Sequence, residues 1–280
     1  MTTTAVDETN GVSLESDASL PAEGPQALIV DCNDLVVEAR SRNGRTRGVD
    51  GVDLYLAPGQ LVCVTGPTGS GKSTLARALG DVYDTSVRII GGDAYIGGIS
   101  LKHPGRDKRI LSFATGYLAQ GANNDLPARL TAHDIIAEPI MRRHKRVNSR
   151  VLGARVATLL DEFHLPLGVA EKFPYELSAG MRQRVAIARS LVLEPQVFIA
   201  DEPLANLDVK MRKVVFDAIA RRRKEFEMAA VIVTNDMDFV RELHAETLVM
   251  LDGAVIAEGV GRDLNWTPGV RRPEGMSSYE

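Results

Sequence analysis

The sequence predicts an α/β fold with a parallel central sheet, and two patterns in the chain carry this prediction. Between residues 177 and 234, helical patterns such as MRQRVAIARSLVLE alternate with short apolar runs such as QVFIA and AAVIVT. Strands buried on both faces of a parallel sheet are apolar throughout, and the intervening helices cover those faces. Earlier in the chain, the run LVCVT precedes a glycine-rich turn and the helical pattern STLARALG, which repeats the strand-to-helix order.

Short strand-like runs in the first hundred residues predict a small antiparallel β subdomain beside this sheet. They are rich in β-branched and aliphatic residues and are separated by turn residues, above all Pro58-Gly59. The Arg- and Gly-rich segment RSRNGRTRG, residues 40–48, is predicted to be a turn. The strand-like runs lie at residues 28–40, 51–56, 60–66 and 87–99.

Helical spacing of apolar residues between residues 131 and 163 predicts helices, and residues 125–175 read as an inserted helical lobe. Near the C-terminus, LVMLDGAVIAEG predicts a hairpin that turns at Asp252-Gly253. The predicted organisation is one folded domain over residues 28–265, followed by a C-terminal tail over residues 266–280.

Residues 1–27 form a separate segment by composition. They contain five acidic residues, no basic residue and few large apolar residues. Such a segment cannot bury enough surface to offset the entropy of ordering, so it is predicted to be disordered. The remaining 253 residues carry 33 basic and 32 acidic side chains, a balance that does not favour nucleic acid as a partner.

No segment reads as a signal peptide or a membrane-spanning helix. The N-terminal segment lacks a basic start and an apolar core, and no apolar run approaches the roughly 20 residues that a bilayer requires. Cys32 and Cys63 lie in strand-like runs without metal-ligand spacing, which indicates reduced core thiols in a cytosolic protein.

The segment GPTGSGKST has the spacing of a phosphate-binding loop. It follows a strand and opens a helix, so backbone N–H groups and the helix N-terminus face an anion together. The alternative, an accidental glycine-rich turn, does not account for glycine, lysine and serine all at the required spacing. Lys72 is expected to reach the β- and γ-phosphates of a nucleotide, and the Ser73 hydroxyl to bind Mg²⁺. The expected nucleotide contacts in this loop are Gly66, Pro67, Thr68, Gly69, Ser70, Gly71, Lys72, Ser73 and Thr74.

Two acidic residues follow the apolar part of VFIADEP. Asp201 is expected to hold Mg²⁺ through water, and Glu202 to polarise the attacking water as a general base. Without the phosphate loop, such a pair after a strand is more often a helix cap. Together with the loop, it predicts a site that hydrolyses a nucleotide.

The segment LSAGMRQR opens a predicted helix, which Ser178 can cap so that its positive end faces an anion. A plain N-cap is the alternative reading. The segment resembles the LSGGQ signature of the ATP-binding subunits of ABC transporters: Ser178 and Gly180 match, whereas Ala179 and Met181 depart. The resemblance implies a P-loop, RecA-like core with a helical lobe. It also implies a dimer in which Ser178 faces the γ-phosphate of ATP bound to the opposite subunit.

Four further segments extend the resemblance over residues 28–260. ANLD resembles the D-loop, which implies that Asp208 lies at the dimer interface. In GYLAQ, Gln120 matches the Q-loop, which implies a role in catalysis and Mg²⁺ binding and a link to the membrane subunits. LTAHDIIAEPI and KFPYELSAG look like the peptide and nickel importer subgroup, with phosphonate-utilisation ATPases as near relatives. That subgroup's usual HPYT segment is missing, so the imported solute stays open among peptide, metal and phosphonate.

The resemblance also implies partners and a location. The chain is expected to pair with a second ATPase subunit and to drive separate permease subunits at the cytoplasmic face of the cell membrane. Soluble ABC ATPases that act on DNA or ribosomes are rivals. The DNA-repair members carry far longer insertions than the 106 residues that separate Lys72 from Ser178, and the ribosome-acting members usually carry two cassettes.

Two basic runs, residues 142–146 and 221–224, are not interleaved with aromatic residues. They are expected to be solvated helix faces rather than nucleic-acid contacts. The first run lies on the predicted helical lobe, where membrane subunits dock in the family, so it is also a candidate partner contact.

The adenine contact departs from the family pattern, which places an aromatic ring upstream of the phosphate loop. Here the only aromatic residue before Gly66 is Tyr55, which lies in a predicted strand and is expected in the core. Arg40 or Arg42 could stack on the base instead, through the guanidinium plane.

The segment VIVTND matches the switch strand of the family, and Asn235 stands where the family has a histidine. A histidine can stabilise charge that develops on the γ-phosphate, whereas asparagine donates a hydrogen bond but carries no charge. Two interpretations stay open: Asn235 lowers the hydrolysis rate by roughly 10²–10³-fold, or it caps a turn and hydrolysis proceeds slowly but adequately. Slow hydrolysis fits a regulatory, nucleotide-gated subunit. A sound signature with an altered switch fits a heterodimer with an active partner ATPase.

Overall fold

A computed structural model describes residues 27–41, 44–143, 147–260 and 263–268 of the chain. The segment expected to be disordered, residues 1–27, and the expected C-terminal tail lie almost entirely outside these ranges. Within them, no helix combines the length and the apolar composition needed to cross a membrane.

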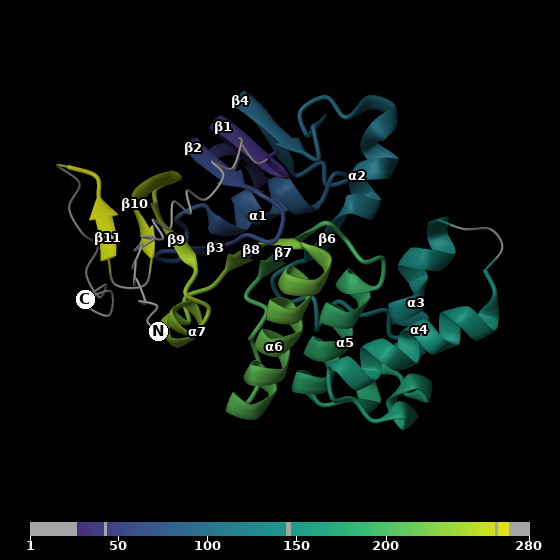
Figure 1. The fold of residues 1–280 in the computed structure, drawn as a ribbon. Coiled ribbons are helices and arrows are strands. Elements are labelled where there is room, and N and C mark those ends of the chain that lie inside the picture. Colours follow the sequence, from purple (N-terminus) through teal and green to yellow (C-terminus); the bar gives the residue numbers. More distant parts are fainter. Residues whose placement is uncertain (1–26, 42–43, 144–146, 261–262, 269–280) are drawn as a thin grey trace, which may run out of the picture.

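A seven-stranded sheet forms the centre of the molecule, in the order β11-β10-β9-β3-β8-β7-β6 (Figure 1). Neighbouring strands from β9 to β6 run parallel, and β10 and β11 add an antiparallel edge. The predicted parallel sheet is confirmed, and so is the hairpin at Asp252-Gly253. The strands are β3 (Leu61–Thr65), β6 (Thr115–Leu118), β7 (Val197–Asp201), β8 (Ala229–Val233), β9 (Glu246–Leu251), β10 (Ala254–Val260) and β11 (Asp263–Trp266).

Strand β3 illustrates why the central strands are apolar throughout. Val62 and Val64 pack with helix α1 (Lys72–Gly80) and the antiparallel sheet, whereas Leu61 and Cys63 pack with the larger helices. Every residue of β3, β7 and β8 is buried. Because burial on both faces leaves no room for unpaired polar side chains along these strands, the chemistry-bearing residues follow at their carboxyl ends.

A four-stranded antiparallel sheet, in the order β2-β1-β4-β5, packs on the other side of α1. The Arg- and Gly-rich segment predicted to be a turn belongs largely to this sheet, because Arg40 pairs with Arg45 and Glu38 with Arg47. The chain reverses within this segment, as predicted, but the predicted turn was too long because exposed strand positions tolerate charge. Arg45 makes a cross-strand ion pair with Glu38 at 3.3 Å. The strands are β1 (Val30–Ser41), β2 (Gly44–Leu56), β4 (Val87–Ile96) and β5 (Ile99–Ser100).

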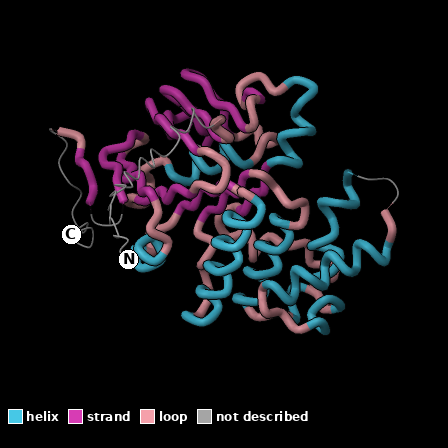
Figure 2. Tube along the Cα trace, in the orientation of Figure 1, coloured by secondary structure: helices cyan, strands magenta, loops and turns pink. Residues whose placement is uncertain are grey.

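Helices α5 and α6 cover the face of the parallel sheet opposite α1, and α3 and α4 extend this helical layer to one side (Figure 1). Figure 2 shows the resulting separation, with most of the cyan helices below the magenta strands. The helices are α2 (Lys108–Ala114), α3 (Ala132–Arg143), α4 (Ser149–Glu162), α5 (Ala179–Leu191), α6 (Val209–Phe226) and α7 (Met237–Glu242), with short 3-10 helices at Gly105–Asp107, Leu167–Glu171 and Pro174–Glu176.

Both cysteines are free thiols in the core, as the sequence predicts. Burial raises the pKa of Cys32 and of Cys63 to about 12. Both thiols are therefore protonated and unreactive at neutral pH.

The basic run at residues 221–224 is only in part the solvated helix face that the sequence predicts, because Arg221 and Lys224 are exposed but Arg222 is not. Arg222 is buried and donates to the carboxylate of Glu162 at 2.9 and 2.5 Å, and Arg221 contacts the same carboxylate at 2.6 Å. Glu162 is the last residue of α4 and is itself nearly inaccessible, so it needs cationic partners. The run therefore joins α6 to α4.

Candidate functional site

The phosphate loop leaves the buried end of β3 and enters α1 at Lys72. Its three glycines adopt positive φ, 140° at Gly66, 87° at Gly69 and 103° at Gly71. A Cβ atom at Gly66 would lie 2.1 Å from the Met250 carbonyl oxygen, and one at Gly71 would lie 2.0 Å from the Gly48 carbonyl oxygen. Only glycine fits at Gly66 and Gly71, because both the backbone conformation and the space exclude a side chain.

The Lys72 ammonium lies inside the loop rather than in solvent. Its Nζ donates to the carbonyl oxygens of Gly66 at 2.7 Å and Pro67 at 2.9 Å. Burial lowers the pKa of Lys72, while the carboxylates of Glu202 and Asp201 act in the opposite direction. A cation is thus held close to two acidic residues that lie far from it in the sequence.

Asp201 ends strand β7 with its side chain almost completely buried. Its Oδ1 atom has no hydrogen-bond partner among the described residues. Burial raises the pKa of Asp201, and a hydrogen bond with the Ser73 side chain and the charge of Lys72 lower it in part. A carboxylate oxygen beside a serine hydroxyl is a donor set for a hard cation such as Mg²⁺. The described residues contain no group of three or more His, Cys, Asp or Glu side chains that could hold a metal, so these two would share it with water or phosphate.

Glu202 comes directly after Asp201, and a hydrogen bond to strand β8 fixes its backbone. It has φ of 52°, and its N–H donates to the Val233 carbonyl oxygen at 2.9 Å. The Thr234 hydroxyl lies 3.5 Å from Glu202 Oε2 and donates to it. Burial and the charge of Asp201 raise the pKa of Glu202, whereas a hydrogen bond from the Asn235 backbone lowers it. The carboxylate is therefore held in place and disposed to accept a proton.

Asn235 follows β8 and turns its side chain toward the phosphate loop. Its Oδ1 accepts hydrogen bonds from the Thr65 hydroxyl at 3.2 Å and from the Gly66 N–H at 3.3 Å. The residue that caps the following helix, α7, is Asp236, which accepts from the Phe239 N–H at 3.1 Å. The reading of Asn235 as a cap is therefore wrong.

Gln120 lies two residues beyond strand β6 and is exposed. Strand β6 pairs in parallel with β7, so the carboxyl ends of both strands meet at the same edge of the sheet. This places Gln120 at the edge that also carries Asp201 and Glu202.

The signature and D-loop residues form a second group at the N-termini of α5 and α6. Ser178 Oγ accepts from the Met181 N–H at 3.2 Å, and Asp208 Oδ1 accepts from the Met211 N–H at 2.9 Å. Both side chains are exposed helix N-caps, as the simplest reading of Ser178 predicts.

The start of α5 packs closely against the segment before α6 at Gly180. A Cβ atom at Gly180 would lie 3.0 Å from the Asn206 carbonyl oxygen, so a side chain there would crowd this contact. A residue that the sequence did not single out, Gln183, connects the group to the acidic pair: its buried Nε2 donates to the Pro203 carbonyl oxygen at 2.9 Å. A polar residue amid the apolar face of MRQRVAIARSL was the signal available for it.

Tyr55 is not in the core, which corrects the sequence prediction. It is 44% exposed, and its hydroxyl accepts from the Asn33 side chain at 2.9 Å. Its neighbours Leu54 and Leu56 occupy the buried face of β2, so strand alternation turns Tyr55 outward. Of the two arginines considered for the adenine contact, Arg40 is exposed on β1, and Arg42 lies outside the described residues.

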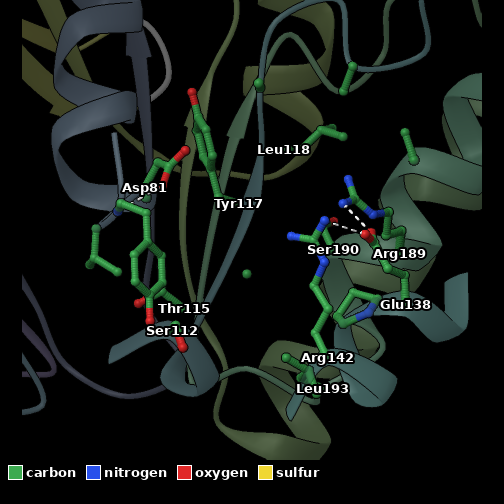
Figure 3. Close-up of a pocket in the computed structure, with 18 of the residues that line it drawn as sticks. Asp81, Ser112, Thr115, Tyr117, Leu118, Glu138, Arg142, Arg189, Ser190 and Leu193 are labelled. Atoms are coloured by element: carbon green, nitrogen blue, oxygen red, sulfur yellow. Dashed lines mark hydrogen bonds and ion pairs between the residues drawn. The ribbon is translucent and has the colours of Figure 1, made fainter. Parts of the chain in front are cut away.

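A cavity of about 370 Å³ opens between β6, α3 and α5 (Figure 3). Glu138 accepts at 2.7 Å from both Arg142 and Arg189 on one side of it. Thr115 and Tyr117 of β6 lie across from them. The sequence did not predict this cavity, because its walls come from segments that are far apart in the chain.

Residues 49–205 match the ABC transporter family. The oligopeptide transport ATP-binding protein OppF of Lactococcus lactis subsp. lactis (strain IL1403) is 31% identical over 244 residues, which cover 84% of this chain and 75% of OppF. OppD of Mycobacterium tuberculosis (strain H37Rv) is 30% identical over 266 residues, 91% of this chain but 42% of OppD. These relatives bear out the resemblance to the peptide importer subgroup.

Solved structures agree with the fold. A dimeric bacterial ABC transporter cassette aligns with a TM-score of 0.75 and 26% identity over 82% of this chain and 98% of the cassette chain. The same cassette in a post-hydrolysis dimer bound to ADP and Pi gives a TM-score of 0.74 at the same identity and coverage. The chain therefore belongs to the ABC transporter family, and it is an ATPase of the ATP-binding cassette type.

Proposed function

We propose that this chain hydrolyses MgATP as one subunit of a dimer and thereby powers a membrane permease that imports a small solute. The observation that carries the proposal is the convergence of three groups at one edge of the parallel sheet. They are the enclosed ammonium of Lys72, the unpartnered carboxylate oxygen of Asp201 and the held carboxylate of Glu202.

Nucleotide binding is assigned to the phosphate loop. Its glycines leave backbone N–H groups open to phosphate oxygens, and the N-terminus of α1 favours negative charge. The Lys72 ammonium exchanges the neutral carbonyls of Gly66 and Pro67 for charged β- and γ-phosphate oxygens. Charge-assisted hydrogen bonds are the stronger ones, so this exchange favours the bound state.

Asp201 and Ser73 are proposed to hold the Mg²⁺ that accompanies ATP, with Gln120 approaching from the neighbouring strand. Mg²⁺ would neutralise the negative charge that builds up on the phosphate oxygens. The unpartnered Oδ1 of Asp201 fits this role, because a buried carboxylate oxygen without a cation or donor is unfavourable.

Glu202 is proposed to take the proton of the attacking water. Its raised pKa makes it a stronger base than an ordinary glutamate. The second subunit would supply Ser178 and Gly180, so that the positive end of its α5 faces the γ-phosphate, with Asp208 of the D-loop alongside.

The cavity between β6, α3 and α5 is the proposed contact with the permease. The Nε atoms of Arg143 and Arg189 are buried there without a hydrogen-bond partner among the residues that the structure describes, and Met141 is exposed nearby on α3. A permease segment with an acidic side chain and an apolar flank would complement these groups. Ala119 lines the cavity directly before Gln120, so a docked segment would lie next to the nucleotide edge.

The imported solute is proposed to be a peptide, with metal and phosphonate as the alternatives. The support is that relatives similar to most of this chain are named as oligopeptide and peptidoglycan transport ATP-binding proteins. The same proposal places the chain at the cytoplasmic face of the membrane.

The proposal is tested with the complex purified through this chain from its native host. Membrane-spanning proteins are expected to co-purify, and the complex is expected to hydrolyse ATP only when Mg²⁺ is present. Glu202→Gln should lower the rate by roughly 10²–10⁴-fold and leave ATP affinity unchanged. Lys213→Ala, on an exposed face of α6, is the matched control and should behave like the parent. A Gln variant that turns over at the parent rate would contradict the role of Glu202.

A second candidate function is a weakly hydrolysing, regulatory subunit paired with an active ATPase. The observation that favours it is the neutral side chain of Asn235, which cannot supply the charge of a histidine. Asn235→His should then raise the ATPase rate of the complex. If native complexes contain two copies of this chain and no other ATPase, the heterodimer is excluded.

A further inference from the structure

We infer that Asn235 is a positioning residue for the phosphate loop, which acts on the binding of ADP and ATP alike rather than on the γ-phosphate alone. The inference rests on the proposed nucleotide site and assigns a role within it. Its basis is that the Asn235 side-chain oxygen accepts the N–H of Gly66, the first residue of the loop, at 3.3 Å, and the Thr65 hydroxyl at 3.2 Å.

A hydrogen bond to Gly66 affects the phosphate loop strongly, because Gly66 also contacts Lys72. Its N–H is bonded to Asn235, and its carbonyl oxygen accepts from Lys72 Nζ at 2.7 Å. Its backbone has φ of 140° and approaches the Met250 carbonyl too closely for any Cβ atom. A rotation of Gly66 therefore moves the carbonyl that holds the ammonium, so the Asn235 bond helps to set where Lys72 points.

Asn235 is itself well anchored. Its backbone hydrogen-bonds Glu202, and the next residue, Asp236, caps α7 and forms an ion pair with Arg212 of α6. Arg212 Nε also donates to the Leu207 carbonyl oxygen beside the D-loop aspartate at 3.2 Å. A fixed backbone lets the exposed Asn235 side chain restrain the loop instead of following it.

The chemistry favours asparagine over histidine for this task. A carboxamide oxygen accepts hydrogen bonds at every physiological pH, whereas an imidazolium only donates. A residue that serves the γ-phosphate would matter for ATP turnover and not for ADP. A residue that holds the first amide of the loop matters for both nucleotides, because both bind through the same loop.

The experiment uses the full chain and three variants: Asn235→Ala, which removes the acceptor, Asn235→Asp, which keeps an acceptor oxygen, and Asp238→Ala as the control. Asp238 is on α7, and its side chain is 96% exposed. Hydrogen exchange of the Gly66 amide is followed by NMR without nucleotide, and ADP and ATP affinities are measured by calorimetry in the presence of Mg²⁺.

Asn235→Ala should speed Gly66 exchange by roughly 2- to 10-fold and weaken ADP and ATP binding by a similar, mutually equal factor, which is the net effect of one hydrogen bond. Asn235→Asp should keep the Gly66 amide protected, and Asp238→Ala should match the parent throughout. Unchanged Gly66 exchange in Asn235→Ala overturns the inference, and so does a fall in kcat with unchanged ADP affinity. A parent that binds neither nucleotide overturns the proposed function instead, and the exchange comparison then still decides the role of Asn235.

Discussion

The residues around the phosphate loop and those around the signature differ in how many of their polar groups find partners within one chain. In the group around the phosphate loop, Asp201 keeps an unpartnered buried oxygen, and burial raises the pKa of Glu202. In the group around the signature, Ser178 and Asp208 are exposed and already bonded to N–H groups of their own helices. The first group is an incomplete binding site that a cation and phosphates would complete. The second is already satisfied by its own helices, which fits the proposed role of these residues in the site of another subunit.

The largest effect should come from separating the two groups onto different chains. Ser178→Arg and Glu202→Gln should each lower ATPase activity by at least roughly 10²-fold, the first by blocking the partner's site and the second by removing the base. If a dimer of this chain is active, an equal mixture of the two variants regains about a quarter of the parent activity, because random pairing restores one complete site in half of the dimers. The measurement is steady-state ATPase activity against the mixing ratio. No recovery, in dimers shown to exchange subunits, would contradict sites shared across an interface.

The next effect concerns the cation of the first group. Lys72→Ala should weaken ATP binding by roughly 10- to 100-fold, since a buried charged donor to the phosphates is lost. Ser178→Ala in the isolated chain should leave ATP affinity unchanged, because Ser178 bonds within its own helix. Equilibrium binding with a fluorescent ATP analogue checks both variants. An equal loss of ATP affinity in both variants would contradict the difference between the two groups.

The sequence predicted the first group well because it follows from local rules. The apolar runs LVCVT, VFIAD and AAVIV show where three strands end. Because these strands run parallel, their carboxyl ends meet at one edge of the sheet, and Lys72, Asp201 and Glu202 lie there. Strand β6 was missed, because TGYL is too short and mixed to stand out between α2 and Gln120.

Contacts between distant segments could not be predicted in the same way. The bond from Gly66 to Asn235 spans 169 residues, and no local pattern encodes it. Arg222 looked like part of a solvated run until Glu162, 60 residues away, was found against it. Tyr55 was assigned to the core because it lies within a predicted strand, although alternation along β2 turns it outward. In each case tertiary packing, rather than residue type, decides the environment.

A smaller effect should appear in the stability of the nucleotide-free chain. Burial raises the pKa of Glu202 above its ordinary value of 4.5, so the folded state holds the proton to higher pH than the unfolded state does. The stability from this group is fully present below pH 4.5 and is lost as pH rises through the folded-state pKa. Glu202→Gln should therefore have a higher Tm than the parent at neutral pH, and the difference should shrink toward pH 4.5.

Thermal melts across this pH range check the prediction, with Asp217→Asn as the control. Asp217 is exposed on α6, where it pairs with Lys213 at 3.3 Å. A Glu202→Gln variant less stable than the parent at neutral pH would mean that the carboxylate is satisfied in the free chain. Glu202 would then no longer distinguish the phosphate-loop group from the signature group.

The smallest effect should come from the second group, where the side chains act as caps. Asp208→Ala removes the acceptor for the Met211 N–H at the start of α6 and should cost about 1 kcal/mol, or about 2–4 °C in Tm. Asp208→Asn is the matched variant, because asparagine caps a helix as well as aspartate does and loses only the interaction of a negative charge with the helix dipole. Its Tm should lie within about 1 °C of the parent. In the isolated chain neither variant should alter ATP affinity, since Asp208 bonds within its own helix and not to the phosphate loop. A loss of ATP affinity in Asp208→Ala that Asp208→Asn does not share would show that the cap supports the nucleotide site within one chain, and the two groups would then be one.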